Sequence, residues 1–370
     1  MKRRSLTDKE RLDWLRLSRT HRIGPITFHK LMEMCGSASA ALERIPDLSR
    51  RGGQAAPLKP YTLEQAQKEI DNLTRLKGRF LYQCEPDYPE PLAAIEDAPP
   101  VIAVLGHPSL LLKESLGIVG ARNASLNGRK MAERLAYDLG VKGYIITSGL
   151  ARGIDTAAHK KALLTGTTAV LAGGVDVVYP EENKGLYEQI IESGCILSDQ
   201  PMGTKPQATL FPRRNRLISG LSLGIIVVEA AQRSGSLITA RMALEQGRDV
   251  FAVPGSPLDP RANGTNDLLR QGAILTETAQ DVLTHLNAPK TLFSEKDSQP
   301  FEDAKPRLDE AQLPAAREEI LMNLSTSPVC VDELVRECQL SLPLVHTILL
   351  ELELAGRLER QSGNCVALAG

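Results

Sequence analysis

Long apolar runs and clustered cysteines are both missing from this 370-residue sequence. No apolar stretch approaches the roughly 20 residues of a membrane-spanning helix. The opening MKRRSLTDKERLDWL has basic residues with no apolar run behind them, which argues against a secretory signal. The six cysteines form no C-x-x-C pair, and the six histidines do not cluster near them. We therefore expect a reduced, cytoplasmic protein with no membrane partner, no structural metal and no disulfide framework.

An excess of either charge is also missing, because 44 Lys+Arg balance 45 Asp+Glu to a net charge of −1. A nucleic-acid binder usually has a basic excess, so the average argues against that class. The average hides a pattern: residues 1–90 carry +5, 91–100 carry −2, 101–289 carry +2 and 290–370 carry −6. This pattern predicts a helical domain at 1–79, an α/β domain at 80–288, a Pro-rich linker at 289–313 and a small domain at 314–370.

The middle domain alternates apolar runs with amphipathic segments. Ile-Ile-Val-Val at 225–228 is typical of a strand buried on both faces of a parallel sheet. Met131, Leu135 and Leu139 share one face of a predicted helix. We predict an α/β fold, an extended Rossmann-like doubly wound parallel sheet with its ligand site at the carboxyl ends of the strands. The predicted strands cover 116–120, 144–147, 168–172, 195–198, 224–229, 249–253 and 273–276.

The flanking domains show weaker patterns. Ile23-Gly24-Pro25 before an amphipathic stretch resembles a helix-hairpin-helix, or is a plain helical turn. The C-terminal region predicts three helices and a hairpin over 357–361 and 365–368, as in a winged helix. Its third helix, 341–355, contains Glu351 and Glu353 but no Lys or Arg. An accessory or protein-interaction role is therefore favoured over reading of duplex DNA.

Four segments of the middle domain contain residue types that bind anions. Arg122 ends the segment GIVGAR, and Arg152 lies between two glycines of SGLARGID, whose amides could converge on a phosphate. The segment FPRRNR at 211–216 supplies arginines for bidentate phosphate contacts. RSGS at 233–236 places small hydroxyl residues where a helix begins. The alternative is a tight turn capped by Asp155 for SGLARGID, a solvated surface for FPRRNR and a simple helix cap for RSGS.

Enzyme signatures are absent from these loops. No G-x-G-x-x-G and no G-x-x-x-x-G-K-[ST] occur, which disfavours a dinucleotide dehydrogenase and a Walker-type ATPase. His159 is expected to be a solvated helix residue. Asp155, Asp199 and Glu229 are not paired by spacing, so we expect a site that binds rather than reacts, without a cofactor.

Together these segments resemble the DNA-processing protein A family (DprA, also called Smf). The resemblance rests on 117–122, 148–155, FPRRNRLI at 211–218, SGSLITA at 234–240, and 254–256 with 264–266, after a lead-in at 87–106. It implies a protein that binds single-stranded DNA, protects incoming strands in natural transformation and loads RecA recombinase. It also implies a homodimer formed through the Rossmann-like domain.

Carried over by motif, the DNA- and phosphate-binding residues would be Arg122, Ser148, Gly149, Arg152, Gly153, Arg214, Asn215, Arg216, Ser234, Gly235 and Ser236. Arg213 occupies a variable position of the motif and ranks lower. Aromatic residues are scarce between 101 and 289, so we expect phosphate contacts to dominate over base stacking.

Two other functions remain open at this point. Rossmann-like nucleoside-monophosphate phosphoribohydrolases have a similar layout, but the double glycine and following glutamate of their loop are absent after Glu229. A transcription factor acting through the winged helix is disfavoured by the acidic third helix.

Overall fold

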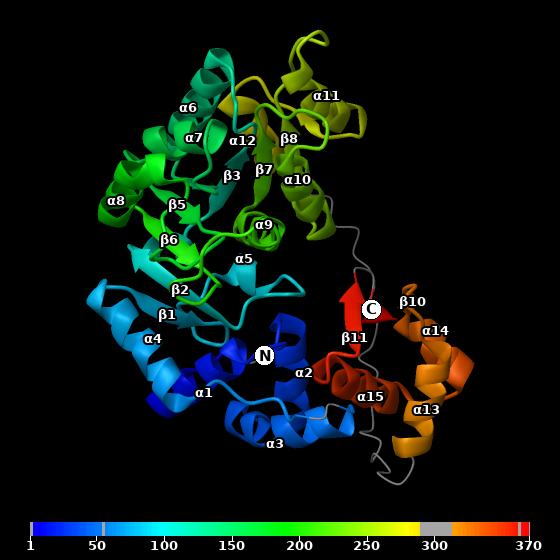
Figure 1. Cartoon of the computed structure of the whole chain (residues 1–370). Helices are drawn as coiled ribbons and strands as arrows, with labels where there is room; N and C mark the ends of the chain where they lie inside the picture. Colours follow the sequence, from blue (N-terminus) through cyan, green and yellow to red (C-terminus); the bar gives the residue numbers. More distant parts are fainter. Residues whose placement is uncertain (1–2, 54–55, 289–312, 362–363, 370) are drawn as a thin grey trace. The chain divides into compact units, whose positions relative to one another are not determined.

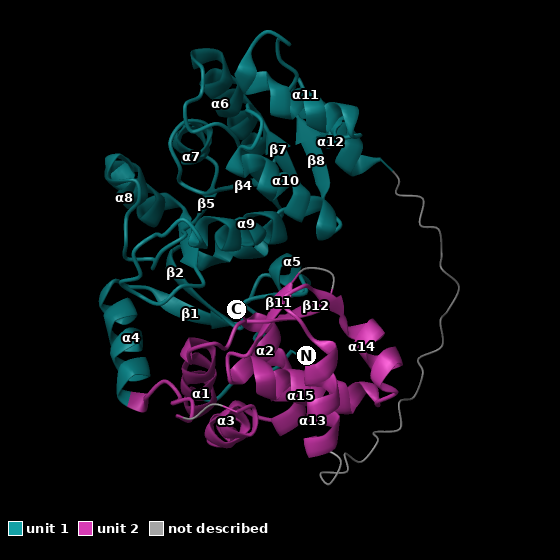
Figure 2. Ribbon diagram, turned by 45° about the vertical axis from the view of Figure 1, so that its right-hand side comes forward, with its two compact units in different colours: residues 1–7, 64–289 teal, residues 8–63, 290–370 magenta. Residues whose placement is uncertain are grey.

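A computed structural model describes residues 3–53, 56–288, 313–361 and 364–369 (Figure 1). The chain divides into two compact units (Figure 2). We call residues 1–7 and 64–289 the sheet unit, and residues 8–63 and 290–370 the helical unit. Residues 289–312 of the predicted linker lie outside the described residues, and Leu313 begins a helix.

The sheet unit is built on one nine-stranded sheet, in the order β1-β2-β6-β5-β4-β3-β7-β8-β9. The strands are β1 (Arg79–Tyr82), β2 (Val101–Gly106), β3 (Ser115–Val119), β4 (Ile145–Ser148), β5 (Thr167–Val170), β6 (Cys195–Ser198), β7 (Gly224–Val227), β8 (Asp249–Ala252) and β9 (Ile274–Leu275). Its helices are α4 (Leu63–Arg75), α5 (Glu90–Ala93), α6 (Leu126–Val141), α7 (Ile154–Ala162), α8 (Lys184–Ser193), α9 (Leu210–Leu221), α10 (Gly235–Glu245), α11 (Asn263–Arg270) and α12 (Ala279–Asn287). Short 3-10 turns lie at Pro108–Leu112, Glu181–Asn183 and Pro260–Ala262.

Strands β3 to β9 run parallel, and the direction of winding reverses at β3. The chain proceeds from β3 through β4 and β5 to β6 on one side, and through β7 and β8 to β9 on the other. Such a switch point leaves a crevice at the carboxyl ends of the strands, where ligands bind in open α/β sheets. The predicted doubly wound sheet is confirmed.

Alternate strand residues fill two cores, as period-two geometry requires. Ile118 and Ile226 pack with α6, α7 and α12 on one face. Val119 and Val227 pack with α5, α9 and α10 on the other. All four strand side chains are at most 4% exposed, which explains why the strands are continuous apolar runs in the sequence.

Two strands of the nine-stranded sheet were not predicted. β1 and β2 extend the sheet beyond β6, and both pairings, β1 with β2 and β2 with β6, are antiparallel. The run Val-Ile-Ala-Val-Leu at 101–105 had the composition of a buried strand, and every one of its residues is buried. β1 is only four residues long, and its first residue is exposed, so its pattern is weak.

The helical unit combines an N-terminal segment, residues 8–63, with the C-terminal part of the chain, residues 290–370. It contains α1 (Asp8–Arg19), α2 (Pro25–Cys35), α3 (Ala38–Arg51), α13 (Leu313–Asn323), α14 (Val331–Cys338) and α15 (Leu342–Leu354), with a small sheet ordered β10 (Val329–Cys330), β12 (Cys365–Leu368), β11 (Leu358–Gln361). The predicted winged helix is confirmed by these three C-terminal helices and their hairpin.

The third helix of this winged helix, α15, packs against α3. A Cβ on Gly52 would lie 2.0 Å from the carbonyl oxygen of Glu351, so the two backbones meet where only glycine fits. Thr27 donates a hydrogen bond to Glu353 at 2.9 Å. Glu353 also accepts one from Arg360, and Glu351 pairs with Arg317. The acidic residues of the expected recognition helix are thus held by partners inside the unit.

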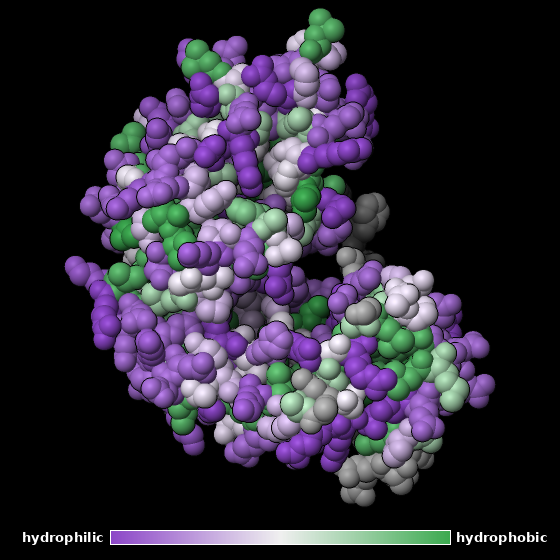
Figure 3. All heavy atoms as spheres, in the orientation of Figure 1, coloured by the Kyte–Doolittle hydropathy of each residue, from purple (hydrophilic) through white to green (hydrophobic). Residues whose placement is uncertain are grey.

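Among the described residues, no helix combines the length and apolarity needed to cross a bilayer. Figure 3 shows one face of the molecule, on which hydrophilic side chains predominate and apolar ones are interspersed.

Candidate functional site

The candidate site lies at the carboxyl edge of the parallel strands. The loops after β3 and β7 flank the switch point, and Glu229 from the second loop holds the first. Its carboxylate accepts hydrogen bonds from the amide and the hydroxyl of Ser125, at 2.9 and 2.5 Å. Ser125 in turn caps α6 through the amide of Gly128. Glu229 therefore fixes the loop that carries Arg122.

The loop after β4 directs its amides inward. The amides of Gly149 and Ala151 donate to the Asp155 carboxylate at 3.1 and 3.4 Å. The amide of Leu150 donates to Nε2 of His159 at 3.3 Å. The amide cradle that the sequence suggested for a phosphate is thus occupied by the chain's own carboxylate, because Asp155 lies in the first turn of the following helix.

His159 is fully buried, so the prediction of a solvated helix residue is wrong. Its Nδ1 lies 2.7 Å from the hydroxyl of Thr167 on the neighbouring strand. Burial, with the charge of Arg214 as a smaller contribution, lowers the pKa of His159 to about 3. The imidazole is therefore neutral at pH 7 and can accept the Leu150 amide.

The buried side chain of Arg214 connects the loop after β4 with the end of β5. Its Nη1 donates to the carbonyl oxygens of Gly149 and Val170, both at 2.6 Å. Burial lowers the pKa of this guanidinium to about 10, which leaves it charged at pH 7. Burial also raises the pKa of the Asp155 carboxyl, and the charge of Arg214 partly offsets that rise. Arg214 compensates a buried carboxylate and ties the ends of β4 and β5 together.

The other predicted residues of α9 are also buried. Arg216 pairs with Asp199 at 2.7 Å and with Asp97 at 3.3 Å. The side-chain amide of Asn215 donates to the carbonyl oxygen of Gly235 at 3.3 Å, which links α9 to the start of α10. Arg214, Asn215 and Arg216 are only 5–8% exposed. The arrangement differs from the expected phosphate contacts, because these polar groups already have protein partners.

The exposed cations lie elsewhere on the same edge. Arg122, Arg152, Arg213 and Arg233 are exposed, so the position that ranked lower in the motif, Arg213, is the accessible one in its segment. Arg152 makes a surface ion pair with Glu182 at 2.5 Å, and such a pair costs little to exchange for another anion. A Cβ on Gly153 would lie 2.5 Å from the Arg122 carbonyl oxygen, so the two loops are in close contact.

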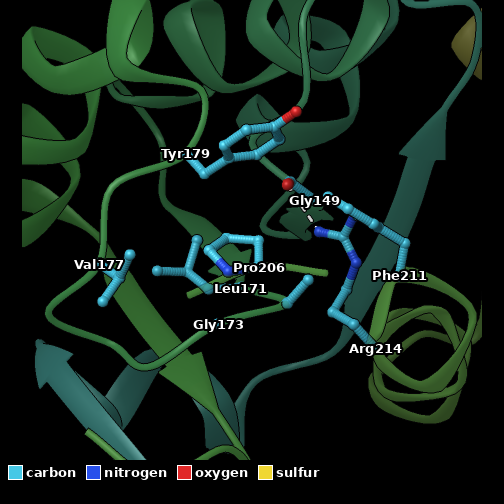
Figure 4. A pocket seen from close by; sticks show the side chains of 9 residues that line it. Gly149, Leu171, Gly173, Val177, Tyr179, Pro206, Phe211 and Arg214 are labelled. Carbon is cyan, nitrogen blue, oxygen red and sulfur yellow. Dashed lines mark hydrogen bonds between the residues drawn. The ribbon is translucent and has the colours of Figure 1, made fainter. Parts of the chain in front are cut away.

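A pocket opens between the segments that follow β4, β5 and β6 and the start of α9 (Figure 4). It is lined by Gly149, Leu171, Ala172, Gly173, Val177, Tyr179, Pro206, Phe211 and Arg214, and its cavity volume is only about 10 Å³. The rings of Tyr179 and Phe211 lie 5.7 Å apart, and the Arg122 guanidinium lies 5.1 Å from the centre of the Phe211 ring. Sequence reasoning missed this pair, although Phe211 is the first residue of the segment FPRRNR.

The start of α10 offers an open helix end. Ser234 caps the helix by accepting from the Ser236 amide at 3.4 Å, and the two hydroxyls lie 2.7 Å apart. A Cβ on Gly235 would meet no atom within 4 Å. Ser148, in contrast, is fully buried and donates to the Ile118 carbonyl oxygen at 2.6 Å. The predicted site residues thus fall into two sets: Arg122, Arg152, Gly153, Ser234 and Gly235 are at least partly accessible, and Ser148, Gly149, Arg214, Asn215, Arg216 and Ser236 are buried.

The chain matches three family descriptions in sequence order. Residues 8–72 match the DprA-like N-terminal HHH domain, residues 79–287 match DNA recombination-mediator protein A, and residues 304–364 match the DprA winged helix domain. Protein Smf of Escherichia coli (strain K12) is 40% identical over 292 residues, which cover 76% of this chain and 75% of that protein. DNA processing protein DprA of Bacillus subtilis (strain 168) is 44% identical over 211 residues, covering 56% of this chain and 71% of that protein.

Solved structures give the same result. DNA processing protein A from Streptococcus pneumoniae superposes with a TM-score of 0.62 at 36% identity, covering 77% of this chain and 98% of that one. DNA processing protein A from Helicobacter pylori, studied for its single-stranded DNA binding mode, gives 0.53 at 28% identity, covering 57% and 95%.

Proposed function

The chain belongs to the DNA recombination-mediator protein A family, and from that premise we propose that it binds single-stranded DNA in DNA recombination. The observation that carries the proposal is the grouping at one sheet edge. Exposed Arg122 and Arg152 lie on touching loops, beside a pocket that contains Phe211 and Tyr179. Arginines serve the phosphates of a strand, and aromatic faces serve its unpaired bases.

The two sets of site residues have different tasks in this proposal. Arg122, Arg152, Gly153, Ser234 and Gly235 contact the phosphates directly, and Arg213 joins them because it is exposed. The buried residues Ser148, Gly149, Arg214, Asn215, Arg216 and Ser236 position the loops. Arg214 and Arg216 offset the charges of Asp155 and Asp199, and the carboxylate of Glu229 is directed at Ser125.

Protection of incoming strands in natural transformation and the loading of RecA belong to the same proposal. So does a homodimer formed through the Rossmann-like domain. Support for a dimer comes from the free edge of the sheet, where the two-residue strand β9 ends on Leu275, a leucine that is 52% exposed. Leu258, in the loop after β8, is 93% exposed. Exposed apolar side chains beside an open strand edge favour self-association.

Binding of a fluorescent oligodeoxythymidine, measured by anisotropy with an unlabelled duplex as competitor, tests the function. We expect binding that the duplex competes for poorly and that Arg122→Ala weakens by about tenfold, the loss of one charge-assisted contact. Lys142→Ala is the control, because exposed Lys142 lies just before β4, at the opposite edge of the sheet. Equal losses of affinity in the two variants would contradict the placement of the DNA site at the carboxyl ends of the strands.

The competing enzymatic function is a nucleoside-monophosphate phosphoribohydrolase, which the general α/β layout also allows. Its test is incubation of the protein with nucleoside monophosphates and chromatography of the products. We expect no free base, because the carboxylates nearest the pocket have structural partners. Release of free base that is lost in Asp155→Asn would replace the binding function with the catalytic one.

A further inference from the structure

Two cysteines of the winged helix face each other across neighbouring strands. Cys330 ends β10 and Cys365 begins β12, and the two residues are direct partners in the antiparallel register. Their sulfur atoms lie 2.8 Å apart, and no disulfide bond joins them. Cys330 is exposed and Cys365 is partly exposed, so a small reagent can reach the pair.

The backbone around the pair suits a covalent link. The amide of Val331 donates to the carbonyl oxygen of Asn364 at 3.0 Å, and this bond flanks the two cysteines. Cys330 and Cys365 therefore form a non-hydrogen-bonded pair, the kind in which Cα atoms approach to about 4.5 Å. A disulfide needs Cα atoms about 4.4–6.8 Å apart, so the bond can form without moving either strand.

The remaining cysteines have different surroundings. Cys84, Cys195 and Cys338 are buried, and burial raises the pKa of the Cys195 thiol to about 12. Cys35 is half-buried beside Arg44. Because thiolates react and buried thiols do not, accessibility and a facing partner together single out Cys330 and Cys365.

We propose that Cys330 and Cys365 form a reversible redox site that a peroxide closes and a dithiol reopens. The thiolate of one cysteine attacks hydrogen peroxide, which gives a sulfenic acid and releases hydroxide. The second thiolate attacks the sulfenic sulfur, forms the S–S bond and expels the oxygen as water. Overall, two thiols lose two electrons and two protons, and one peroxide is reduced to two waters. Exchange with a dithiol restores both thiols.

The bond would staple the small sheet of the winged helix. The two cysteines are 35 positions apart, and the loop that they close contains α14, α15 and β11. Closing a loop of this length restricts the unfolded chain and stabilises the folded one. α15 also packs against α3, so the staple would stiffen the element that joins the two halves of the helical unit. Oxidation would thereby stabilise this unit and leave the DNA-binding edge of the sheet unit chemically unchanged.

The test is treatment of the reduced full-length chain with hydrogen peroxide, followed by thiol titration and non-reducing tryptic mass spectrometry. Cys330 lies in the tryptic peptide 318–336 and Cys365 in 361–370, so the link is separated from any link to Cys338. We expect these two peptides joined with the loss of two hydrogens, a fall from six titratable thiols to four, and full reversal by dithiothreitol. The thermal unfolding midpoint should rise on oxidation and return on reduction.

Cys330→Ser and Cys365→Ser should each abolish the link and the stabilisation, whereas Cys35→Ser should leave both unchanged. Three results would overturn the proposal: six thiols retained after treatment, sulfinic or sulfonic acid at either cysteine without the link, or a disulfide found only between two chains on a non-reducing gel. The wild-type measurement decides on its own if a serine variant fails to fold.

Discussion

The guanidinium of Arg214 lies 2.6 Å from the carbonyl oxygen of Gly149, so a helix residue holds the loop that follows β4 (Figure 4). The same nitrogen reaches Val170 at the end of β5. An arginine in a motif of three arginines thus acts below the surface, and the shape of the candidate site depends on it.

Arg214→Lys should lower the free energy of unfolding by about 2–4 kcal/mol, because one ammonium cannot replace the planar fork and leaves buried carbonyls unpaired. Urea unfolding measures the loss. Arg213→Lys is the matched control. Arg213 is exposed, so this substitution should change the free energy of unfolding by less than about 0.5 kcal/mol. A similar stability in both variants would show that Arg214 does not anchor the loop.

Acidification should destabilise the protein through His159. The folded pKa of about 3 lies below the ordinary value of 6.5, so between these values only the unfolded chain takes up this proton. The free energy of unfolding should therefore fall as pH decreases below 6.5, by up to about 1.4 kcal/mol per pH unit from this group. Urea unfolding between pH 7 and 5 measures the slope.

His159→Gln is the comparison, because glutamine cannot titrate and its side-chain oxygen can accept the Leu150 amide. Burial raises the pKa of Asp155, which acts in the opposite direction at lower pH, but that contribution is common to both proteins. The variant should show the shallower slope. Parallel curves would mean that His159 is protonated in the folded state.

The order of the parallel strands in the sheet unit could be predicted from the sequence, because buried parallel strands are continuous apolar runs. Cys195–Ser198 was predicted to the residue, and the other parallel strands within a few residues. The antiparallel pairings of β1 and β2 could not be predicted, since pairing direction depends on contacts far apart in the sequence. The same limit applies to Gly52 and Glu351, whose backbones meet across about 300 positions.

The candidate site was predictable in its location but not in its accessibility. Arg122 and Arg152 are exposed as expected, yet Arg214 and Arg216 are buried. One helix carries Arg213 on its solvent side and the other two arginines against carbonyls and carboxylates, and residue type alone does not distinguish these environments. The pairing of Tyr179 with Phe211 needed the fold, because Tyr179 lies in the loop after β5 and Phe211 in the first turn of α9.

Phe211 and Arg122 should act together in binding. The cation–π contact between them is worth about 0.5–1 kcal/mol at an exposed site, so Phe211→Leu should weaken oligodeoxythymidine binding about two- to fivefold. In an Arg122→Ala background the same substitution should have a smaller effect. A double-mutant cycle by anisotropy measures the coupling. Strictly additive losses of binding free energy would show that the two residues act independently.

Gly52→Ala should destabilise the helical unit by about 1–3 kcal/mol, the usual cost of overpacking. The added Cβ would lie 2.0 Å from the Glu351 carbonyl oxygen and 2.7 Å from the Ala355 Cβ, so α3 and α15 must separate. Gly24→Ser controls for loss of a glycine in the same unit, because a Cβ there meets no atom within 4 Å. Thermal unfolding compares the two, and an unchanged midpoint in Gly52→Ala would show that the packing is not tight.

The central claim is that exposed arginines at the carboxyl edge of the sheet bind the phosphates of a single strand. Its most direct test is the salt dependence of oligodeoxythymidine binding for the unaltered chain, Arg152→Ala and Lys142→Ala. Each phosphate contact adds about 0.7 to the slope of log affinity against log salt. We predict a steep slope for the unaltered chain and for Lys142→Ala, and a slope about 0.7 shallower for Arg152→Ala. An Arg152→Ala protein with the affinity and slope of the unaltered chain would contradict the account.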